Sequence, residues 1–214
     1  MNQPWWQHKI VWGLGLLGAV MWVLTPLLGA LVWPLYQPVQ HPIAILTAAD
    51  NTFRTVFVNF GIMAGLFIMI FLLALSEYFK HEKQHSIANK IFQVMLTLLF
   101  LLAFDWFWPL RSISQAALVP HVWQVRDGVA GVILVLVALS YWQLGRSLEY
   151  GQQRSLGNLW RLAGVLLILF ALVAGMVNLL GWPLTGLFDQ LQNLVTIVPI
   201  FYTSWHIIRL AEHK

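Results

Sequence analysis

The chain has 214 residues, of which 59% are hydrophobic and only 9% are charged, and it contains no cysteine. A soluble domain carries about 25% charged residues, so this composition excludes a water-soluble globule and indicates a membrane protein. The absence of cysteine excludes disulfides, thiolate metal sites and a cysteine nucleophile. The net charge of +4 suits membrane topology better than nucleic-acid binding, because of where the charges lie along the chain.

The first apolar run covers residues 9–33, and it is longer than the roughly 20 residues that a helix needs to cross a bilayer. It contains Gly13-Leu14-Gly15-Leu16-Leu17-Gly18, which matches the dinucleotide-binding pattern G-x-G-x-x-G. That pattern requires a preceding strand, so that a helix N-terminus can receive the pyrophosphate. No strand is expected here, so we predict a retained membrane helix in which these glycines allow close packing.

Five further apolar runs, bounded by proline, glycine or charged residues, predict spans at about residues 55–79, 89–110, 128–145, 158–181 and 187–210. The fourth of these six runs is short. It could begin earlier, near Val119, if Arg126 and Asp127 are buried or paired. The expected fold is therefore all-α, a bundle of six transmembrane helices that forms one integral membrane domain over residues 1–214.

The basic residues predict the orientation of this bundle. With the N-terminus in the cytoplasm, that side receives nine of the twelve basic residues: Lys9, Lys80, Lys83, Lys90, Arg146, Arg154, Arg161, Arg209 and Lys214. The other side receives Arg54, Arg111 and Arg126. By the positive-inside rule, both termini are expected in the cytoplasm of a multi-pass protein of the cell membrane, a bacterial-type inner membrane or a plasma membrane. Most tryptophans fall near span ends, where amphipathic rings settle at headgroup depth.

Polar residues near the outer ends of the spans are the candidates for a site. Asp105 is expected to be the only acid within a span, where a carboxylate costs about 2.5–3.5 kcal/mol and therefore faces protein or water. It could serve a site, or it could simply pair with Arg111 or Arg126. Asn59 is expected about one turn into the second span from the same side.

The candidate ligand-binding residues of this outer face are Tyr36, His41, Asn59, Asp105 and His121. Histidine and carboxylate together can transfer protons or bind zinc. The spacing lacks the close His pairs of a metal site, so no metal and no cofactor is expected, and no residue is assigned a catalytic role. The alternative is that these are solvated loop residues at the level of the lipid headgroups.

Partners are expected to be membrane lipids and not nucleic acid. Gly61 and Gly65 form a G-x-x-x-G face, which allows close approach of a second helix. That second helix could belong to the same chain or to another copy in a homo-oligomer.

Several short motifs carry a resemblance to a known group: Pro34-Leu35-Tyr36-Gln37-Pro38, His41-Pro42-Ile43, Asn59-Phe60-Gly61, Trp108-Pro109 followed by His121, and Gly186-Leu187-Phe188-Asp189-Gln190. The chain resembles the domain of unknown function 998 family of six-pass membrane proteins. It departs from that pattern at Ala44, where serine is expected, and at Arg111, where an acid is expected. The resemblance implies a six-helix bundle with an outward-facing pocket, and it implies no reaction.

Three functions remain open at this point. The favoured one is a membrane protein, not an enzyme, that holds a lipid or a small molecule in the outward-facing pocket. The second is a membrane-embedded hydrolase or lipid-remodelling enzyme that uses His41, Asp105 and His121. The third is a small transporter or a subunit of a membrane complex.

Overall fold

The computed structural model of the chain describes residues 4–108 and 120–212, and this part contains helices and no strand. Two short 3-10 turns, η1 (Trp5–Gln7) and η2 (Ile43–Thr47), accompany six long helices. The long helices are α1 (Lys9–Val32), α2 (Arg54–His81), α3 (His85–Phe107), α5 (Pro120–Tyr150), α6 (Arg154–Leu179) and α7 (Thr185–Glu212). The predicted all-α fold is confirmed.

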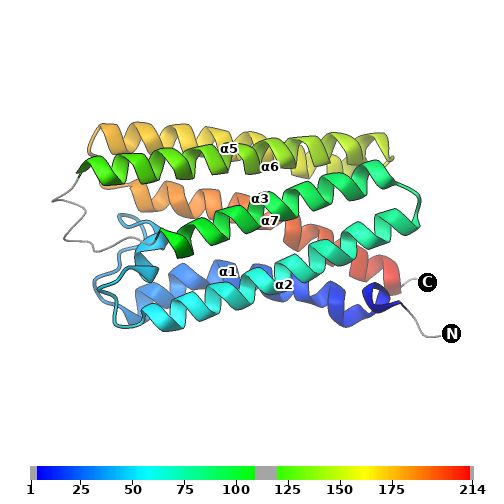
Figure 1. Cartoon of the computed structure of the whole chain (residues 1–214), viewed down its shortest axis with the longest axis horizontal. Coiled ribbons are helices and arrows are strands. Elements are labelled where there is room, and N and C mark those ends of the chain that lie inside the picture. Colours follow the sequence, from blue (N-terminus) through cyan, green and yellow to red (C-terminus); the bar gives the residue numbers. More distant parts are fainter. Residues whose placement is uncertain (1–3, 109–119, 213–214) are drawn as a thin grey trace.

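The six long helices form a closed ring around a common core. Each packs against the next along the chain, and α7 returns to pack against α1 (Figure 1). The start of α1 and the end of α7 lie at one end of the bundle, together with the turns that join α2 to α3 and α5 to α6. The long connection between α1 and α2, with η2, covers the opposite end. We call these the cavity end and the loop end, since the cavity described below lies at the first.

Five of the six helices are long and apolar enough to cross a membrane: Lys9–Val32, Arg54–His81, His85–Phe104, Val125–Tyr150 and Arg154–Leu179. The protein is therefore a helical bundle suited to a membrane. Helix α7, which corresponds to the sixth expected span, is not among them. The count of six spans and the cytoplasmic position of both termini stay predictions.

The candidate span that corresponds to the fourth expected span begins at Val125, earlier than residue 128, and the start near Val119 stays a prediction. Helix α5 begins at Pro120, and within it the Arg126 side chain is buried, with Nη1 3.7 Å from Asp127 Oδ1. The Arg126 Nε also donates to the Trp108 carbonyl at 3.0 Å. Because these polar groups satisfy one another, the helix can extend past them. Residues 109 and 110, the expected end of the third span, lie outside the described residues.

Polar side chains and carbonyls of α7 form hydrogen bonds with other helices inside the ring. Trp22 Nε1 donates to Asn193 Oδ1, Tyr141 Oη to the Thr196 carbonyl at 2.8 Å, Trp160 Nε1 to Thr203 Oγ1 at 3.1 Å, and Ser204 Oγ to the Trp12 carbonyl. Interhelical hydrogen bonds of this kind replace lost hydration in a membrane bundle. These hydrogen bonds join α7 to α1, α5 and α6.

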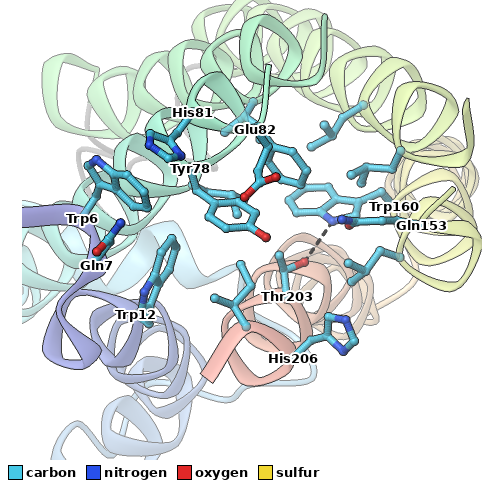
Figure 2. Close-up of a pocket in the computed structure, with 17 residues that line it drawn as sticks. Trp6, Gln7, Trp12, Tyr78, His81, Glu82, Gln153, Trp160, Thr203 and His206 are labelled. Atoms are coloured by element: carbon cyan, nitrogen blue, oxygen red, sulfur yellow. Dashed lines mark hydrogen bonds between the residues drawn. The ribbon is translucent and has the colours of Figure 1, made fainter. Parts of the chain in front are cut away.

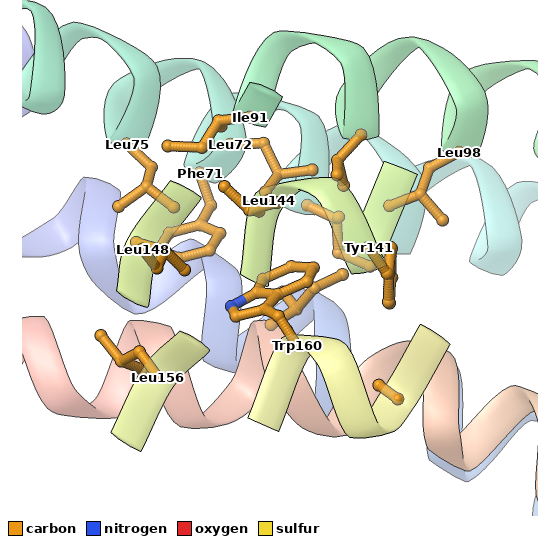
Figure 3. Packing of buried hydrophobic residues seen from close by; sticks show 14 of the residues in the cluster. Phe71, Leu72, Leu75, Ile91, Leu98, Tyr141, Leu144, Leu148, Leu156 and Trp160 are labelled. Carbon is orange, nitrogen blue, oxygen red and sulfur yellow. The ribbon is translucent and has the colours of Figure 1, made fainter. Parts of the chain in front are cut away.

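Large side chains fill the centre of the ring, among them Phe71, Leu72, Tyr141 and Trp160, all fully buried (Figure 3). The rings of Tyr141 and Trp160 meet edge to face, with centroids 4.7 Å apart and planes at 70°. This geometry suits the aromatic quadrupole. It joins α5 to α6 in the middle of the bundle.

Small residues allow the helix backbones to approach closely. A Cβ on Gly15 would lie 2.7 Å from the Phe71 ring, and one on Gly18 would lie 2.9 Å from the Ala64 carbonyl of α2. Two of the three glycines of the G-x-G-x-x-G match, Gly15 and Gly18, therefore serve helix packing as predicted, whereas a Cβ on Gly13 would meet nothing within 4 Å. Close packing also occurs between α5 and α6, where a Cβ on Gly145 would lie 2.6 Å from the Gly157 carbonyl.

The G-x-x-x-G face of α2 divides between two environments. Gly65 is buried, and a Cβ there would lie 2.8 Å from Leu102 of α3 in the same chain. A Cβ on Gly61 would meet open space. One of the two glycines thus has an internal partner, and a homo-oligomer through Gly61 and Gly65 stays a prediction.

Candidate functional site

A cavity of about 390 Å³ lies inside the ring at the cavity end (Figure 2). This volume falls within the range of small-molecule pockets, which are commonly found between the helices of bundles. Every long helix of the described chain contributes to its walls or rim, as does η1. The cavity is thus enclosed by the same ring that forms the core, at the point where the core side chains stop.

The walls of the cavity are mostly apolar and rich in aromatic rings. Leu75, Leu144, Leu148 and Leu156 supply aliphatic surface. Five aromatic side chains line the same space: Trp6, Trp12, Tyr78, Phe79 and Trp160. A body that enters this cavity therefore meets a hydrophobic surface.

The aromatic side chains hold one another in position around Tyr78. The Tyr78 ring meets Trp12 at 90° with centroids 6.1 Å apart, Phe79 at 79° and 5.3 Å, and Trp6 at 71° and 6.3 Å. Edge-to-face pairs of this kind contribute about 0.5–1.5 kcal/mol beyond burial. Tyr78 is therefore the ring that links the other three, and the wall it forms is largely rigid.

Two polar groups in the inner part of the cavity are hydrogen-bonded to each other or to the backbone. Trp160 Nε1 donates to Thr203 Oγ1 at 3.1 Å, and Thr203 Oγ1 donates to the Pro199 carbonyl at 2.6 Å (Figure 2). The remaining polar lining residues are Gln7, His81, Glu82, Gln153 and His206. Each of these is at least partly exposed, so the cavity is apolar in its depth and polar at its mouth.

Two short turns of the same construction carry the rim. Lys83 (φ 59°) follows the end of α2 and Gln152 (φ 67°) follows the end of α5, both in the left-handed region. The next residue in each turn donates back into the helix, Gln84 N to the Phe79 carbonyl at 2.8 Å and Gln153 N to the Leu148 carbonyl at 3.0 Å. This is the Schellman pattern of helix termination. It stops both helices abruptly and brings Glu82 and Gln153 to the cavity mouth.

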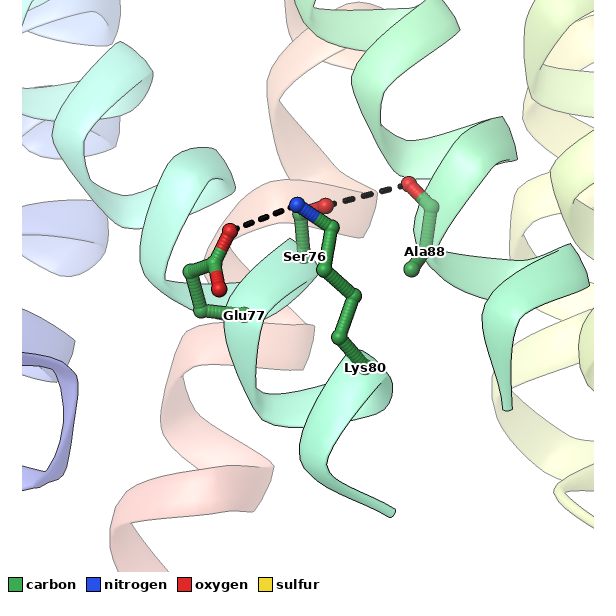
Figure 4. A network of polar contacts seen from close by, with 4 residues as sticks. All are labelled: Ser76, Glu77, Lys80 and Ala88. Atoms are coloured by element: carbon green, nitrogen blue, oxygen red, sulfur yellow. Dashed lines mark hydrogen bonds and ion pairs between the residues drawn. The ribbon is translucent and has the colours of Figure 1, made fainter. Parts of the chain in front are cut away.

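The last turns of α2 are also fixed against α3. Ser76 Oγ donates to the Ala88 carbonyl of α3 at 3.2 Å, and Lys80 Nζ pairs with Glu77 Oε1 at 2.6 Å (Figure 4). The first bond is buried and joins the two helices, whereas the ion pair is half exposed and contributes little. The contact between the end of α2 and the start of α3 thus fixes the position of Glu82 relative to the cavity.

The predicted site residues Tyr36 and His41 lie at the loop end, away from this cavity. Their rings lie 6.4 Å apart, and His41 Nδ1 accepts a hydrogen bond from the Gln37 amide at 3.1 Å. Tyr36 is 3% exposed, and its hydroxyl has no hydrogen-bond partner among the described residues. Burial, and to a smaller extent the nearby Asp189 carboxylate, raises the pKa of the Tyr36 phenol above its usual value.

The described part of the structure does not place the other predicted site residues beside Tyr36 and His41. Asn59 is exposed on α2. Asp105 belongs to α3 and His121 to α5, and their side chains lie outside the described part of the structure. The hydrolase that would use His41, Asp105 and His121, and the transporter or complex subunit, stay predictions.

The expectation that Asp105 is the only acid within a span was wrong. Asp127 lies within the candidate span Val125–Tyr150. Asp189 lies in the second turn of α7, and its Oδ2 accepts a hydrogen bond from the Ile43 amide at 2.7 Å. An acid near a helix end is thus used to hold a loop, which a linear sequence does not reveal.

Residues 37–43 bind the start of α7 through several contacts besides Asp189. Leu187 N donates to the Val39 carbonyl at 2.9 Å, Thr185 Oγ1 to the Gln40 carbonyl at 2.9 Å, and Gln190 Nε2 to the Pro38 carbonyl at 2.5 Å. A Cβ on Gly186 would lie 2.5 Å from the His41 carbonyl. The motifs at residues 34–43 and 186–190 therefore meet in space, and their contact closes the loop end.

The residues at the cavity mouth were not predicted as a site. Most tryptophans were predicted near span ends at headgroup depth, and the structure buries two of them inside the bundle, with Trp12 3% and Trp160 0% exposed. The signal that could have indicated the cavity is the accumulation of tryptophans near the ends of several different spans. Rings from different helices at the same depth can meet inside a bundle instead of facing lipid.

The chain was compared with known protein families, curated proteins and solved structures. No known protein family, no curated protein and no solved structure matches the chain. The resemblance to the domain of unknown function 998 family stays a prediction based on short motifs. The functional argument therefore rests on the chain's own structure, a ring of apolar helices that encloses an aromatic-lined cavity.

Proposed function

We propose that this protein is a polytopic membrane protein that binds an amphiphilic molecule in the cavity of the ring. The observation that carries the proposal is the cavity itself, about 390 Å³ in volume, which is apolar in its depth and polar at its mouth. Ligand pockets have this composition, with a few polar groups that orient a mostly apolar ligand.

The division of the lining residues indicates how such a molecule would lie. Its apolar part would contact Leu144, Leu148 and Trp160 in the depth of the cavity. Its polar head would lie near Glu82 and Gln153, where the rim reaches solvent or lipid headgroups. An amphiphile satisfies both regions at once, whereas a fully polar solute would be desolvated against the aromatic wall.

The proposal moves the binding site from the position expected from sequence. A pocket was expected on the outer face near Tyr36 and His41, whereas this cavity lies at the end predicted to face the cytoplasm. The expected class of function, binding without catalysis, is retained.

Native mass spectrometry of the protein extracted in a mild detergent tests this proposal. Wild-type protein is expected to carry a bound amphiphile. Ile207→Trp, which enlarges a half-buried lining residue, is expected to reduce the bound fraction at least about fivefold by filling the cavity. The matched control is Ile168→Trp, on the exposed face of α6 and not part of the lining. Equal retention by the two variants, with both folded, would contradict the proposal.

A further inference from the structure

The charge inside the cavity is of one sign. Among the described residues that line it, Glu82 is the only aspartate, glutamate, lysine or arginine. Figure 2 shows the Glu82 carboxylate directed into the cavity beside Tyr78. The cavity mouth thus offers one formal negative charge and no permanent positive charge from its own lining.

Three basic residues of this end contact partners outside the cavity. Lys80 Nζ pairs with Glu77 at 2.6 Å, and Arg161 Nη1 pairs with Glu149 at 2.5 Å. The Arg209 guanidinium lies 4.7 Å from the centroid of the Trp205 ring. This end of the bundle is rich in lysine and arginine, yet these three side chains are engaged outside the cavity.

The aromatic wall adds to this electrostatic preference. A π face attracts a cation placed within about 6 Å of its centroid, and tryptophan is the strongest of the rings. Trp6 and Tyr78 are half-buried at the mouth, on the same side as Glu82, whereas Trp12, Phe79 and Trp160 extend the aromatic surface inward. Rings combined with a single carboxylate form the type of site that binds quaternary ammonium groups.

We propose that the occupant of the cavity is a hydrophobic organic cation, an amphiphile whose head is a quaternary ammonium or a protonated amine. Its charged head lies between Glu82 and the rings of Trp6 and Tyr78, and its apolar part lies against Leu144 and Leu148. This inference rests on the proposed function and defines its ligand class. An anionic amphiphile would place like charge beside Glu82, which is unfavourable.

Two probes of nearly the same shape and opposite charge test this inference: tetraphenylphosphonium and tetraphenylborate. Binding is measured by equilibrium dialysis of the full-length protein in a neutral detergent, with binding to protein-free micelles subtracted. Wild-type protein is expected to bind tetraphenylphosphonium at least about tenfold more tightly than tetraphenylborate, since one charge contact near a protein surface corresponds to about that factor.

Substitutions of Glu82 and Glu77 test whether the preference for the cationic probe arises in the cavity. Glu82→Gln is expected to weaken tetraphenylphosphonium binding about tenfold, and Glu82→Lys is expected to invert the preference between the probes. The matched control is Glu77→Gln, on the same helix but outside the cavity and paired with Lys80, which is expected to change binding less than about twofold. Glu82 is exposed, so its variants are expected to fold.

The outcomes separate this inference from the proposed function. Equal binding of both probes, no effect of Glu82→Gln, or no binding of tetraphenylphosphonium would each overturn the cation inference. If both probes bind and Ile207→Trp abolishes both, the cavity is an amphiphile site without charge selection, and only the cation inference fails. If the native mass spectra show no difference between Ile207→Trp and Ile168→Trp, the proposed function fails as well.

Discussion

The two ends of the bundle are built from the same six helices, yet among the described residues one carries a packed loop and the other a cavity. At the loop end, residues 33–53 fold back over the ring, and a small cluster that includes Trp33, Leu46 and Phe57 fills the space. At the cavity end, residues 82–84 join α2 to α3 and residues 151–153 join α5 to α6, and each connection consists of a single Schellman turn. They join the helices without covering the ring.

This difference teaches that connection length decides which end of a helical ring can hold a ligand. A long connection can supply side chains that pack against the helices, as Leu46 does against Gly29 of α1. A short one contributes only its rim residues. The same chain therefore places a structural closure and a candidate binding site at opposite ends of one core.

The largest effect is expected from truncating a buried side chain at the loop end. Leu46 is fully buried, so Leu46→Ala should lower the free energy of unfolding by about 3 kcal/mol, through lost burial and a new void. Leu148→Ala, which only enlarges the existing cavity, should cost about 1–2 kcal/mol. Chemical denaturation in detergent micelles measures both. A Leu148 variant as unstable as the Leu46 variant would show that the two ends are equally well packed.

A second contrast uses glycines. Gly186→Ala places a Cβ against the Pro38 and His41 carbonyls and should destabilise the protein by about 2 kcal/mol. Gly175→Ala meets open space within α6 and should be neutral or stabilising by up to about 1 kcal/mol, because alanine favours helix. Thermal unfolding of the two variants should therefore shift in opposite directions or differ clearly. Similar shifts would mean that residues 37–43 yield to the added methyl group.

The smallest effect concerns Tyr36, whose buried hydroxyl has no partner among the described residues. At neutral pH, Tyr36→Phe should leave stability unchanged or raise it by up to about 1 kcal/mol, since an unpaired polar group is removed from the interior. Unfolding midpoints at pH 7, compared with those of Tyr202→Phe at an exposed site, measure this. A loss above about 1 kcal/mol would indicate that the hydroxyl is hydrogen-bonded after all.

Tyr36→Phe also tests how the stability of the protein depends on pH in the alkaline range. The pKa of Tyr36 is raised in the folded protein, so below the unfolded value of about 10 both states keep the proton and nothing changes. Above that pH the unfolded state releases the proton more readily, and stability falls as pH rises. Tyr36→Phe should therefore lose less stability between about pH 10 and 11 than wild type or Tyr202→Phe. An unchanged alkaline decline would rule out Tyr36 as its source.

Part of the candidate site could be read from the sequence, and part could not. The charged turn with His81 and Glu82, and the tryptophans near the predicted cytoplasmic ends, are visible as a linear pattern. Their convergence on one cavity is not, because Trp6, Glu82 and Trp160 come from separate segments. Tyr36 and His41 were predicted as site residues because their residue types are chemically versatile. In the structure Tyr36 is buried in the apolar cluster of the loop end, and the backbone of His41 lies against Gly186 of α7.

The sequence by itself was enough to predict that this protein is helical and suited to a lipid bilayer. A composition of 59% hydrophobic and 9% charged residues leaves a bilayer as the surrounding medium, and proline, glycine and charge mark the helix ends. Only the tertiary structure decided which polar and aromatic residues face inward. Ser204 Oγ donates to the Trp12 carbonyl across 192 positions of the chain, and Trp22 Nε1 donates to Asn193 Oδ1 across 171 positions. Burial of a polar group is favourable only when such a distant partner is in place, so the closing of the ring by α7 decides it.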